Sequence, residues 1–402
     1  MIRYDQGVTA SGIGLYVHIP FCTAKCGYCD FNSYAGRDHT IPSYARTLLD
    51  DAALWSRAVG GRPVETVFFG GGTPSLVPLA QMRDLIEGIS ATFRISPDAE
   101  ISLEANPGSL TTEYLAGLRG LGFNRLSIGV QSFHDDELRA LDRIHSGDDA
   151  RAAYRSARAA GFGNVNLDFI YGLPEQPIDR WEATLDEALD LAPEHLSLYA
   201  LTVEEGTPLA RDVAHGRVPA PDADAQADQY ELTQDRLDAA GYDHYEISNW
   251  AAPGRACRHN LVYWQNREYL GLGAGAHSFL NGVRFSTVLL PNRYAELVAE
   301  AVAAREAGGG AMPHVAGSEP ITPRLAMADT LILGLRLVTG VAFDAFTARH
   351  GAQIDEVYGD VAREFIGYGL LERTPTHLRL TRRGRLLSNE LFQRLLPETA
   401  TP

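Results

Sequence analysis

The stretch CTAKCGYC at residues 22–29 spaces three cysteines as C-x3-C-x2-C in a chain that has only one other cysteine. It follows a short β-like run at residues 14–20, so the three thiols lie on a loop just after a predicted strand. Thiolates this close together usually hold a soft metal, either zinc or the iron of an iron–sulfur cluster. Structural zinc takes four ligands, commonly from two separated C-x2-C pairs, and no second pair is present. Three thiolates on a four-iron cluster leave one iron open, so we predict a 4Fe-4S cluster at Cys22, Cys26 and Cys29, with a zinc loop as the alternative.

The flanks of this stretch, YVHIPF at 16–21 and DF at 30–31, extend the pattern. Together they resemble the cluster loop of radical S-adenosylmethionine (radical SAM) proteins, in the coproporphyrinogen-dehydrogenase-like branch. The resemblance implies that the open iron chelates the amino and carboxylate groups of SAM. It also implies that an electron from the reduced cluster splits SAM to give a 5′-deoxyadenosyl radical, while the protein supplies binding and orientation.

Composition limits the class of protein. A chain of 402 residues is long enough for one large domain and one smaller domain. Its formal net charge of -16 argues against a nucleic-acid partner, because nucleic-acid binders carry a basic surface. Four cysteines make no disulfide framework, and no apolar run approaches the ~18 residues needed to span a bilayer. With no export signal at the N-terminus, we expect a cytoplasmic protein.

The middle of the chain alternates between β-rich runs and amphipathic helical stretches, which is the pattern of an α/β fold with a parallel sheet covered by helices. The expected strands are 15–19, 64–69, 100–104, 125–130, 165–170 and 195–201. The expected helices are 43–59, 79–92, 112–121, 150–160, 180–191 and 223–240. Six such units predict a partial, six-stranded (β/α)6 barrel, and the radical SAM resemblance implies the same fold.

Several distinctive residues fall at the C-terminal ends of these strands, where barrels of this kind gather their chemistry. The GGGTP stretch at 70–74 follows the second strand, and its glycines allow backbone amides to approach a ligand closely. Asp168 lies within an apolar strand, where a buried acid needs a partner or a ligand. Residue by residue, the resemblance implies SAM contacts at Tyr16, Tyr28, Gly71, Gly72, Thr73, Glu104, Gln131, Arg143, Asp168 and Ala200.

A second distinctive stretch, CRHNLVYW at residues 257–264, follows a run at 242–250 that we expect to form one further strand. Its H-N-x-x-Y-W pattern resembles the haem-chaperone branch, the HemW-type proteins. Cysteine, histidine and tyrosine are all known ligands of haem iron. The haem candidates are therefore Cys257, His259, Asn260, Tyr263 and Trp264, and the ligating atom stays open. The glycine-rich turn GLGAGAHS at 271–278 resembles the family as well.

The low-complexity stretch at 301–317 predicts a join between two domains, 1–300 and 301–402. The first would be the barrel with its H-N-x-x-Y-W extension. The second, a small HemN-like C-terminal domain, reads as helices, a β-hairpin and a terminal helix. That order indicates a winged-helix-like α+β module serving as a lid or docking domain, and the arginines at 379–385 fit a solvated helix start better than a DNA contact.

Two functions stay open at this point, and with them the question of whether the chain is an enzyme. The resemblance implies a haem chaperone that holds the cluster, SAM and haem, receives electrons from a donor, and passes haem to respiratory proteins at the membrane; it also allows a homodimer. The alternative is a radical SAM oxidoreductase that decarboxylates a tetrapyrrole, like oxygen-independent coproporphyrinogen III oxidases. Those enzymes carry a further cysteine where this chain has Phe31, and a longer extension than the 21 residues before Cys22. Both differences favour the chaperone.

Overall fold

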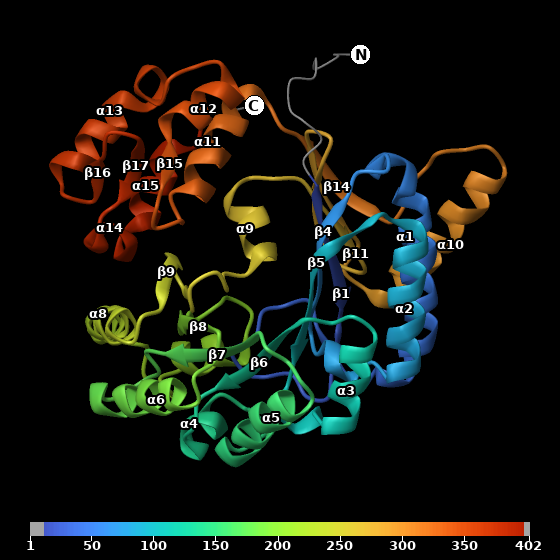
Figure 1. Cartoon of the computed structure of the whole chain (residues 1–402), viewed down its shortest axis with the longest axis horizontal. Coiled ribbons are helices and arrows are strands. Elements are labelled where there is room, and N and C mark those ends of the chain that lie inside the picture. Colours follow the sequence, from blue (N-terminus) through green and yellow to red (C-terminus); the bar gives the residue numbers. More distant parts are fainter. Residues whose placement is uncertain (1–11, 398–402) are drawn as a thin grey trace. The chain divides into compact units, whose positions relative to one another are not determined.

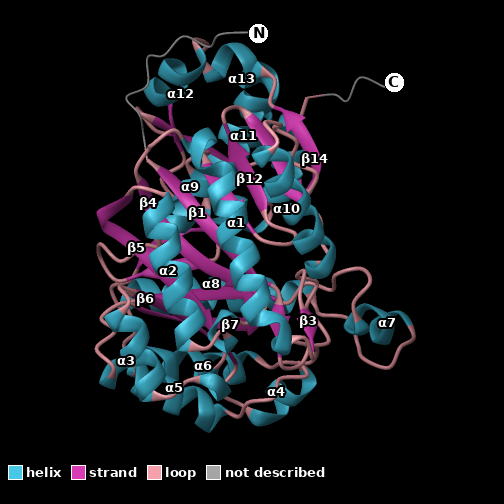
Figure 2. Cartoon of the chain, turned by 90° about the vertical axis from the view of Figure 1, so that its right-hand side faces the viewer, coloured by secondary structure: helices cyan, strands magenta, loops and turns pink. Residues whose placement is uncertain are grey.

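The computed structural model describes residues 12–397, which form two compact units. The first unit comprises residues 12–167, 202–218 and 268–319, and the second comprises 168–201, 219–267 and 320–397. Figure 1 gives the order of the elements along the chain, and Figure 2 shows their secondary structure from a second direction. We describe each unit by itself.

The first unit is built on a sheet whose centre is strand β1 (Ile13–Ile19). Every residue of β1 is buried except Tyr16, which is half-buried, as expected for a parallel strand covered on both faces. β1 pairs in parallel with β4 on one side and β11 on the other, and the parallel pairing continues from β4 to β5 and from β5 to β6. The strand order is β14 (Val315–Pro320), β13 (Val283–Thr287), β12 (His277–Leu280), β11 (Tyr269–Leu272), β1, β4 (Val64–Gly71), β5 (Ile95–Ala105) and β6 (Arg125–Gln131).

Helices between these strands cover the sheet. α1 packs against α2 and α10, and Figure 1 shows these three along the same side of the strands. α5 begins at a capping box in which Ser146 and Asp149 satisfy each other's backbone N–H groups. The helices of this unit are α1 (Ile41–Val59), α2 (Leu79–Thr92), α3 (Thr112–Gly120), α4 (Asp135–Ala140), α5 (Gly147–Ala159), α7 (Pro208–Ala214) and α10 (Pro291–Glu306). Short elements complete it: β2 (Phe21–Cys22), β3 (Tyr34–Ala35), η1 (Asp38–Thr40), η2 (Pro74–Leu76) and η3 (Pro107–Ser109).

The second unit continues the strand–helix alternation. Strand β7 (Val165–Tyr171) begins in the first unit and ends in this one. Here β10 (Asn249–Ala251) lies between β8 (His195–Ala200) and β9 (Asp243–Glu246) and runs antiparallel to both. The single strand expected at 242–250 is therefore wrong: it is two strands with a turn between them, where the Glu246 carboxylate accepts the Ser248 N–H. The helices are α6 (Ile178–Asp190), α8 (Ala223–Ala239) and α9 (Arg258–Trp264).

The C-terminal part of the second unit has its own apolar core, centred on aromatic residues such as Phe346, Tyr358 and Phe365. A three-stranded sheet in the order β15, β17, β16 packs with helices, and the predicted helix, hairpin and terminal helix are confirmed. The elements are α11 (Pro323–Gly334), β15 (Val341–Ala342), α12 (Phe343–His350), α13 (Ile354–Gly367), β16 (Leu371–Arg373), β17 (His377–Leu380), α14 (Arg382–Leu386) and α15 (Ser388–Leu395).

The structure refines the sequence expectations at the edges of elements. All six predicted strands at 15–201 form, but β5 starts at Ile95, five residues before its predicted start. The stretch at 301–317 is only partly irregular, because the alanine-rich α10 continues to Glu306 and β14 begins at Val315. Along residues 12–397, no helix combines the length and the apolar character needed to cross a membrane.

Candidate functional site

The cysteine loop leaves the C-terminal end of β1 and is closed by short-range hydrogen bonds. β2 pairs in parallel with β3, so Cys22 lies opposite Ala35, and the Tyr34 N–H donates to the Pro20 carbonyl at 2.7 Å. Within the loop, Lys25 Nζ donates to the Phe31 carbonyl at 3.0 Å. These contacts hold Cys22, Cys26 and Cys29 half-buried at the end of the sheet. We call the C-terminal ends of β1, β4, β5 and β6, together with this loop, the cluster edge.

The glycines after β4 let the next loop approach the cysteines. The Gly72 N–H donates to the Ile19 carbonyl at 2.9 Å, and a Cβ at Gly72 would lie 3.0 Å from Cys22 Sγ and 2.6 Å from a backbone oxygen. Gly71 has a φ of 115°, and a Cβ there would lie 2.5 Å from the His18 ring. Any side chain at either position would push the loop away, so both glycines are required by close approach.

Hydrogen-bond donors face the sulfurs of all three cysteines. Thr73 Oγ1 donates to Cys22 Sγ at 3.5 Å, and Arg143 Nη1 donates to Cys26 Sγ at 3.5 Å. Burial raises the pKa of the Cys29 thiol, against the opposing effect of the Phe31 N–H that faces it. Donors to cluster sulfurs are among the levers by which proteins stabilise iron–sulfur clusters and set their potential. The donor set around these cysteines therefore fits a cluster.

A single metal ion and a four-iron cluster require different separations between the sulfurs that bind them. In the described part of the chain, no three His, Cys, Asp or Glu side chains converge on one ion position. Around a single tetrahedral zinc, sulfurs bound at about 2.3 Å would stand roughly 3.8 Å apart. A four-iron cube is larger than one ion, and its thiolates stand correspondingly further apart.

Arg143 is the charged centre of the cluster edge. Its guanidinium donates to Cys26 Sγ, to Asn106 Oδ1 at 2.7 Å and to the Gly129 carbonyl at 2.9 Å. Within residues 12–397 it has no carboxylate partner. Although burial opposes its charge, Tyr28 and Cys26 beside it raise the pKa of Arg143. A largely desolvated cation of this kind needs an anion, which both a thiolate-bound cluster and a carboxylate would supply.

The remaining SAM candidates of the first unit gather around the same edge. Glu104 accepts the Gly71 N–H at 3.0 Å. Gln131 adopts a φ of 66°, a strained conformation for a residue with a side chain, and its amide nitrogen lies 2.9 Å from a Cβ position at Gly129. That position is also 3.4 Å from Asn106 and 3.5 Å from Arg143, so these side chains converge. The structure thus brings together the first-unit candidates Tyr16, Tyr28, Gly71, Gly72, Thr73, Glu104, Gln131 and Arg143.

The other two SAM candidates belong to the second unit. Asp168 lies on β7 and Ala200 ends β8. Asp168 is half-buried, whereas every other residue of β7 is buried. Its carboxylate is therefore less enclosed than the sequence suggested. Their part in binding SAM stays a prediction.

Asn106 is a residue of the cluster edge that the sequence did not single out. It follows β5 directly, in the EANP stretch, and its side chain bonds to both Thr73 and Arg143. An asparagine before a proline usually indicates a turn and not a binding site. Its position at a strand end, two residues after Glu104, is the one feature of the sequence that pointed to a role at this edge.

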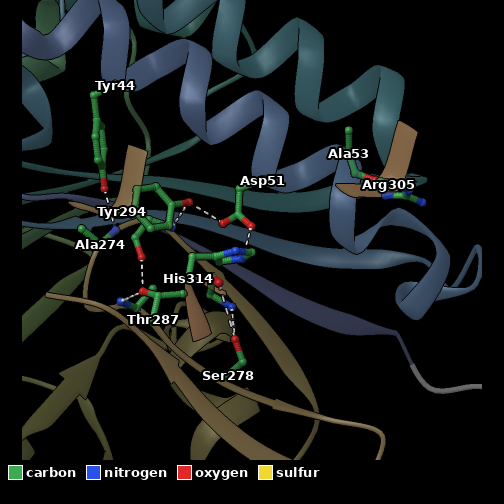
Figure 3. A network of polar contacts seen from close by, with 12 residues as sticks. Tyr44, Asp51, Ala53, Ala274, Ser278, Thr287, Tyr294, Arg305 and His314 are labelled. Carbon is green, nitrogen blue, oxygen red and sulfur yellow. Dashed lines mark hydrogen bonds and ion pairs between the residues drawn. The ribbon is translucent and has the colours of Figure 1, made fainter. Parts of the chain in front are cut away.

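The glycine-rich turn at 271–278 supports β1 from its other side through a buried polar network (Figure 3). Tyr44 OH accepts the Ala274 N–H at 2.8 Å and donates to the His18 carbonyl at 3.1 Å. Tyr294 accepts the Gly273 N–H and donates to Asp51, whose other oxygen lies 3.0 Å from His314 Nε2. Because these residues are almost fully buried, the network fixes the strand from which the cysteine loop departs.

His18 links this support to the cluster edge. Burial lowers its pKa, which keeps the ring neutral. Nδ1 then accepts from Tyr16 OH at 3.0 Å, while Nε2 donates to the Asn32 carbonyl at 2.9 Å. The Asn32 amide in turn donates to Ala274 O and Leu289 O. The hydroxyl of Tyr16, a SAM candidate, is thereby held in place.

The haem candidates lie on and before α9 in the second unit, and we call residues 257–264 the α9 segment. His259 is 1% exposed, and its Nε2 lies 2.9 Å from Tyr263 OH, one helical turn further on. Trp264 lies under the Arg336 guanidinium, whose Cζ is 4.4 Å from the ring centroid. Asn260 Nδ2 is 3.5 Å from Tyr245 OH, and Cys257, before the helix, is fully buried. Of the ligand-type side chains, His259 and Tyr263 are engaged with each other.

Known proteins resemble this chain along most of its length. Residues 16–188 match the Radical SAM superfamily, and residues 321–387 match the HemN C-terminal domain. The protein named Heme chaperone HemW of Mycobacterium tuberculosis (strain ATCC 25618 / H37Rv) is 40% identical over 95% of this chain and 94% of its own. The Heme chaperone HemW of Bacillus subtilis (strain 168) is 35% identical over 95% and 99%, respectively.

A solved structure shows the fold. Coproporphyrinogen III oxidase (HemN) from Escherichia coli, described as a radical SAM enzyme, superposes with a TM-score of 0.82 over 96% of this chain and 91% of its own, at 24% identity. The prediction of a partial radical SAM barrel with a small C-terminal domain is confirmed. At this identity the likeness concerns architecture and not activity.

Proposed function

Since this chain belongs to the HemW family of the radical SAM superfamily, we propose that it is a haem chaperone that holds a 4Fe-4S cluster and SAM and delivers haem to respiratory-chain proteins. The observation that carries the proposal is the similarity, over nearly the full length of both chains, to relatives named as haem chaperones. Both distinctive stretches fall within it, the cysteine loop and the α9 segment.

In this proposal Cys22, Cys26 and Cys29 hold the cluster. Once bound, the cluster and SAM supply reductive SAM cleavage, and the chain binds and orients them. Arg143 offers its charge to the carboxylate of SAM, and Glu104 lies beside the glycine loop where an amino group would be received. The contacts around the three sulfurs support this assignment.

Haem would be taken up at the α9 segment, with His259 or Tyr263 as the iron ligand. If His259 ligates iron through Nε2, its hydrogen bond to Tyr263 must open, so binding and local rearrangement are coupled. We further propose that the protein works in the cytoplasm, where thiols stay reduced, that an electron donor reduces the cluster, and that haem acceptors lie at the membrane.

The alternative is a radical SAM oxidoreductase that decarboxylates a tetrapyrrole. Against it stands Phe31, whose side chain is 64% exposed at the position where the resembling oxidases carry a fourth cysteine. The chaperone is the better-supported function.

Haem transfer tests the proposal. The reconstituted protein would be loaded with haem, separated from free haem, and mixed with membrane vesicles from haem-starved cells. We expect haem to leave the protein and respiratory oxidase activity to appear in the vesicles, faster than with an equal amount of haem on albumin. Equal rates from the two haem sources would reject the chaperone.

A further inference from the structure

A continuous chain of hydrogen bonds joins two of the three cysteines through one amide. Thr73 Oγ1 donates to Cys22 Sγ, and the same oxygen accepts from Asn106 Nδ2 at 3.0 Å. On the other side, Asn106 Oδ1 accepts from Arg143 Nη2 at 2.7 Å, and Arg143 Nη1 donates to Cys26 Sγ. The Asn106 amide thus donates to Thr73, the partner of Cys22, and accepts from Arg143, the partner of Cys26.

Asn106 itself is held firmly. Its N–H donates to Ser75 Oγ at 3.3 Å, Ser75 Oγ lies 2.8 Å from Ser109 Oγ, and Ser109 Oγ donates to the Asn106 carbonyl at 2.9 Å. The strand before it and the 3-10 turn η3 after it fix the backbone on both sides. A side chain anchored in this way can fix the orientation of its two partners.

The orientation of these partners matters for an iron–sulfur cluster. Hydrogen bonds to the sulfurs, and nearby positive charge, stabilise the reduced cluster, which carries the extra electron, and so raise its reduction potential. Accepting from Asn106 leaves the Thr73 hydroxyl hydrogen directed at Cys22. Accepting at Oδ1 holds the guanidinium plane so that its other nitrogen reaches Cys26.

We propose that Asn106 is a positioning residue that sets the reduction potential of the cluster by orienting the side-chain donors to Cys22 and Cys26. This inference rests on the proposed function, because it presupposes the cluster. Asn106 touches neither sulfur itself. It acts through Thr73 and Arg143, so its effect is on the cluster's electronics rather than on ligation.

The test is an anaerobic redox titration of the reconstituted full chain, without SAM or haem, followed by the EPR signal of the reduced cluster. We expect N106A to shift the midpoint potential to a more negative value while keeping full iron content. N106D should shift it further, because it loses the donor to Thr73 and adds a negative charge near the cluster. A merely structural role would lower stability or cluster yield without moving the potential of the molecules that keep a cluster.

N124A is the matched control. Asn124 also fixes a β5 neighbourhood, accepting the Ile101 N–H at 2.8 Å and donating to the Ala99 carbonyl at 2.7 Å. Five residues of strand separate Ile101 from Asn106, about 16 Å. The midpoint potential of the cluster in N124A should therefore equal that of the unmodified chain.

T73V extends the test, since it removes only the hydroxyl that faces Cys22. If Asn106 acts partly through this hydroxyl, the shifts of T73V and N106A are less than additive in the double variant. An unchanged potential in N106A with an intact cluster would overturn the inference; if N106A lost its cluster, unchanged potentials in both N106D and T73V would do so. A failure of the unmodified chain to hold four irons would instead overturn the proposed function.

Discussion

The cluster edge and the α9 segment both gather side chains of the ligand type, but they use them in opposite ways. At the cluster edge, donors point toward half-buried sulfurs, and a cation is held without a carboxylate partner in the described residues. In the α9 segment, His259 is buried and bonded to Tyr263, and Trp264 is covered by Arg336. If the proposed function holds, the first region is organised for its ligand in advance, whereas His259 must give up its contact with Tyr263 to bind haem iron through Nε2.

This difference has an energetic meaning. Preorganised groups bind without first paying for rearrangement. A closed segment binds its ligand more weakly by the free energy of opening. Tight binding suits a resident cofactor, and weaker binding suits a cargo that must be handed on.

The largest expected effect is at the cluster edge. Cys26→Ser should abolish the brown chromophore, because two thiolates do not retain a four-iron cluster. Iron and sulfide analysis after anaerobic reconstitution checks this. Cys257→Ser, in the α9 segment, is the matched control and should keep full cluster content; iron at the unmodified level in the Cys26 variant would remove the cluster from the account.

The second-largest effect should come from removing the charge of Arg143. Arg143→Gln loses about 2 kcal/mol of charge-assisted bonding, which corresponds to SAM binding weaker by roughly 30-fold. Arg143→Lys should recover part of the loss, and Arg139→Gln, an exposed arginine on α4, should change nothing. Equilibrium dialysis with SAM measures the affinities. Equal SAM affinity in the Gln variant and the unmodified protein would mean that this cation serves another anion.

The burial of His145 beside Arg143 should also be visible in the free energy of unfolding. Burial, and then the charge of Arg143, lower the pKa of His145 to about 4, and its Nε2 lies 2.9 Å from the Val130 carbonyl. In the unfolded chain the ring titrates near 6.5, so the unfolded state binds more protons as the pH falls from about 6.5 to about 4. The contribution of neutral His145 to the free energy of unfolding should therefore be complete above pH 6.5. Below that pH the free energy of unfolding should fall by up to about 1.4 kcal/mol per pH unit.

Urea unfolding at pH 7 and pH 5 measures this loss. His145→Gln keeps a donor for the Val130 carbonyl but does not titrate, so it should flatten the pH dependence. An identical slope in the variant and the unmodified protein would assign the loss to other groups.

The smallest effect should come from opening the α9 segment. Tyr263→Phe removes the hydroxyl that occupies His259 Nε2, which frees about 1 kcal/mol and should tighten haem binding by roughly 5-fold if His259 ligates the iron. His259→Ala should weaken haem binding while leaving cluster content unchanged. Haem titration followed in the Soret band distinguishes the two. Weaker binding in the Phe variant would point to Tyr263 as the ligand instead.

The sequence predicted the parts of the molecule whose signal is local. The strand ends placed the GGGTP stretch at 70–74 and Glu104 at one edge, because parallel strands end together, whereas Arg143 was indicated by the family resemblance. The pairing of His259 with Tyr263 is also local, since residues four apart share a helix face once α9 is known to be a helix.

Contacts between distant stretches could not be predicted in this way. The role of Asn106 depends on Thr73 and Arg143, which lie 33 and 37 residues away in the chain. Arg336 covers Trp264 from another helix, and Asp51 meets His314 across most of the first unit's sequence. None of these residues carries a pattern of its own, so only the fold reveals their partners.

The most direct test of the account is a haem titration and a coproporphyrinogen III turnover assay on one anaerobically reconstituted sample. A haem chaperone should bind close to one haem per chain and form no decarboxylated product. Turnover to protoporphyrinogen would contradict it, and would show that Phe31 in place of the fourth cysteine does not prevent the oxidase reaction.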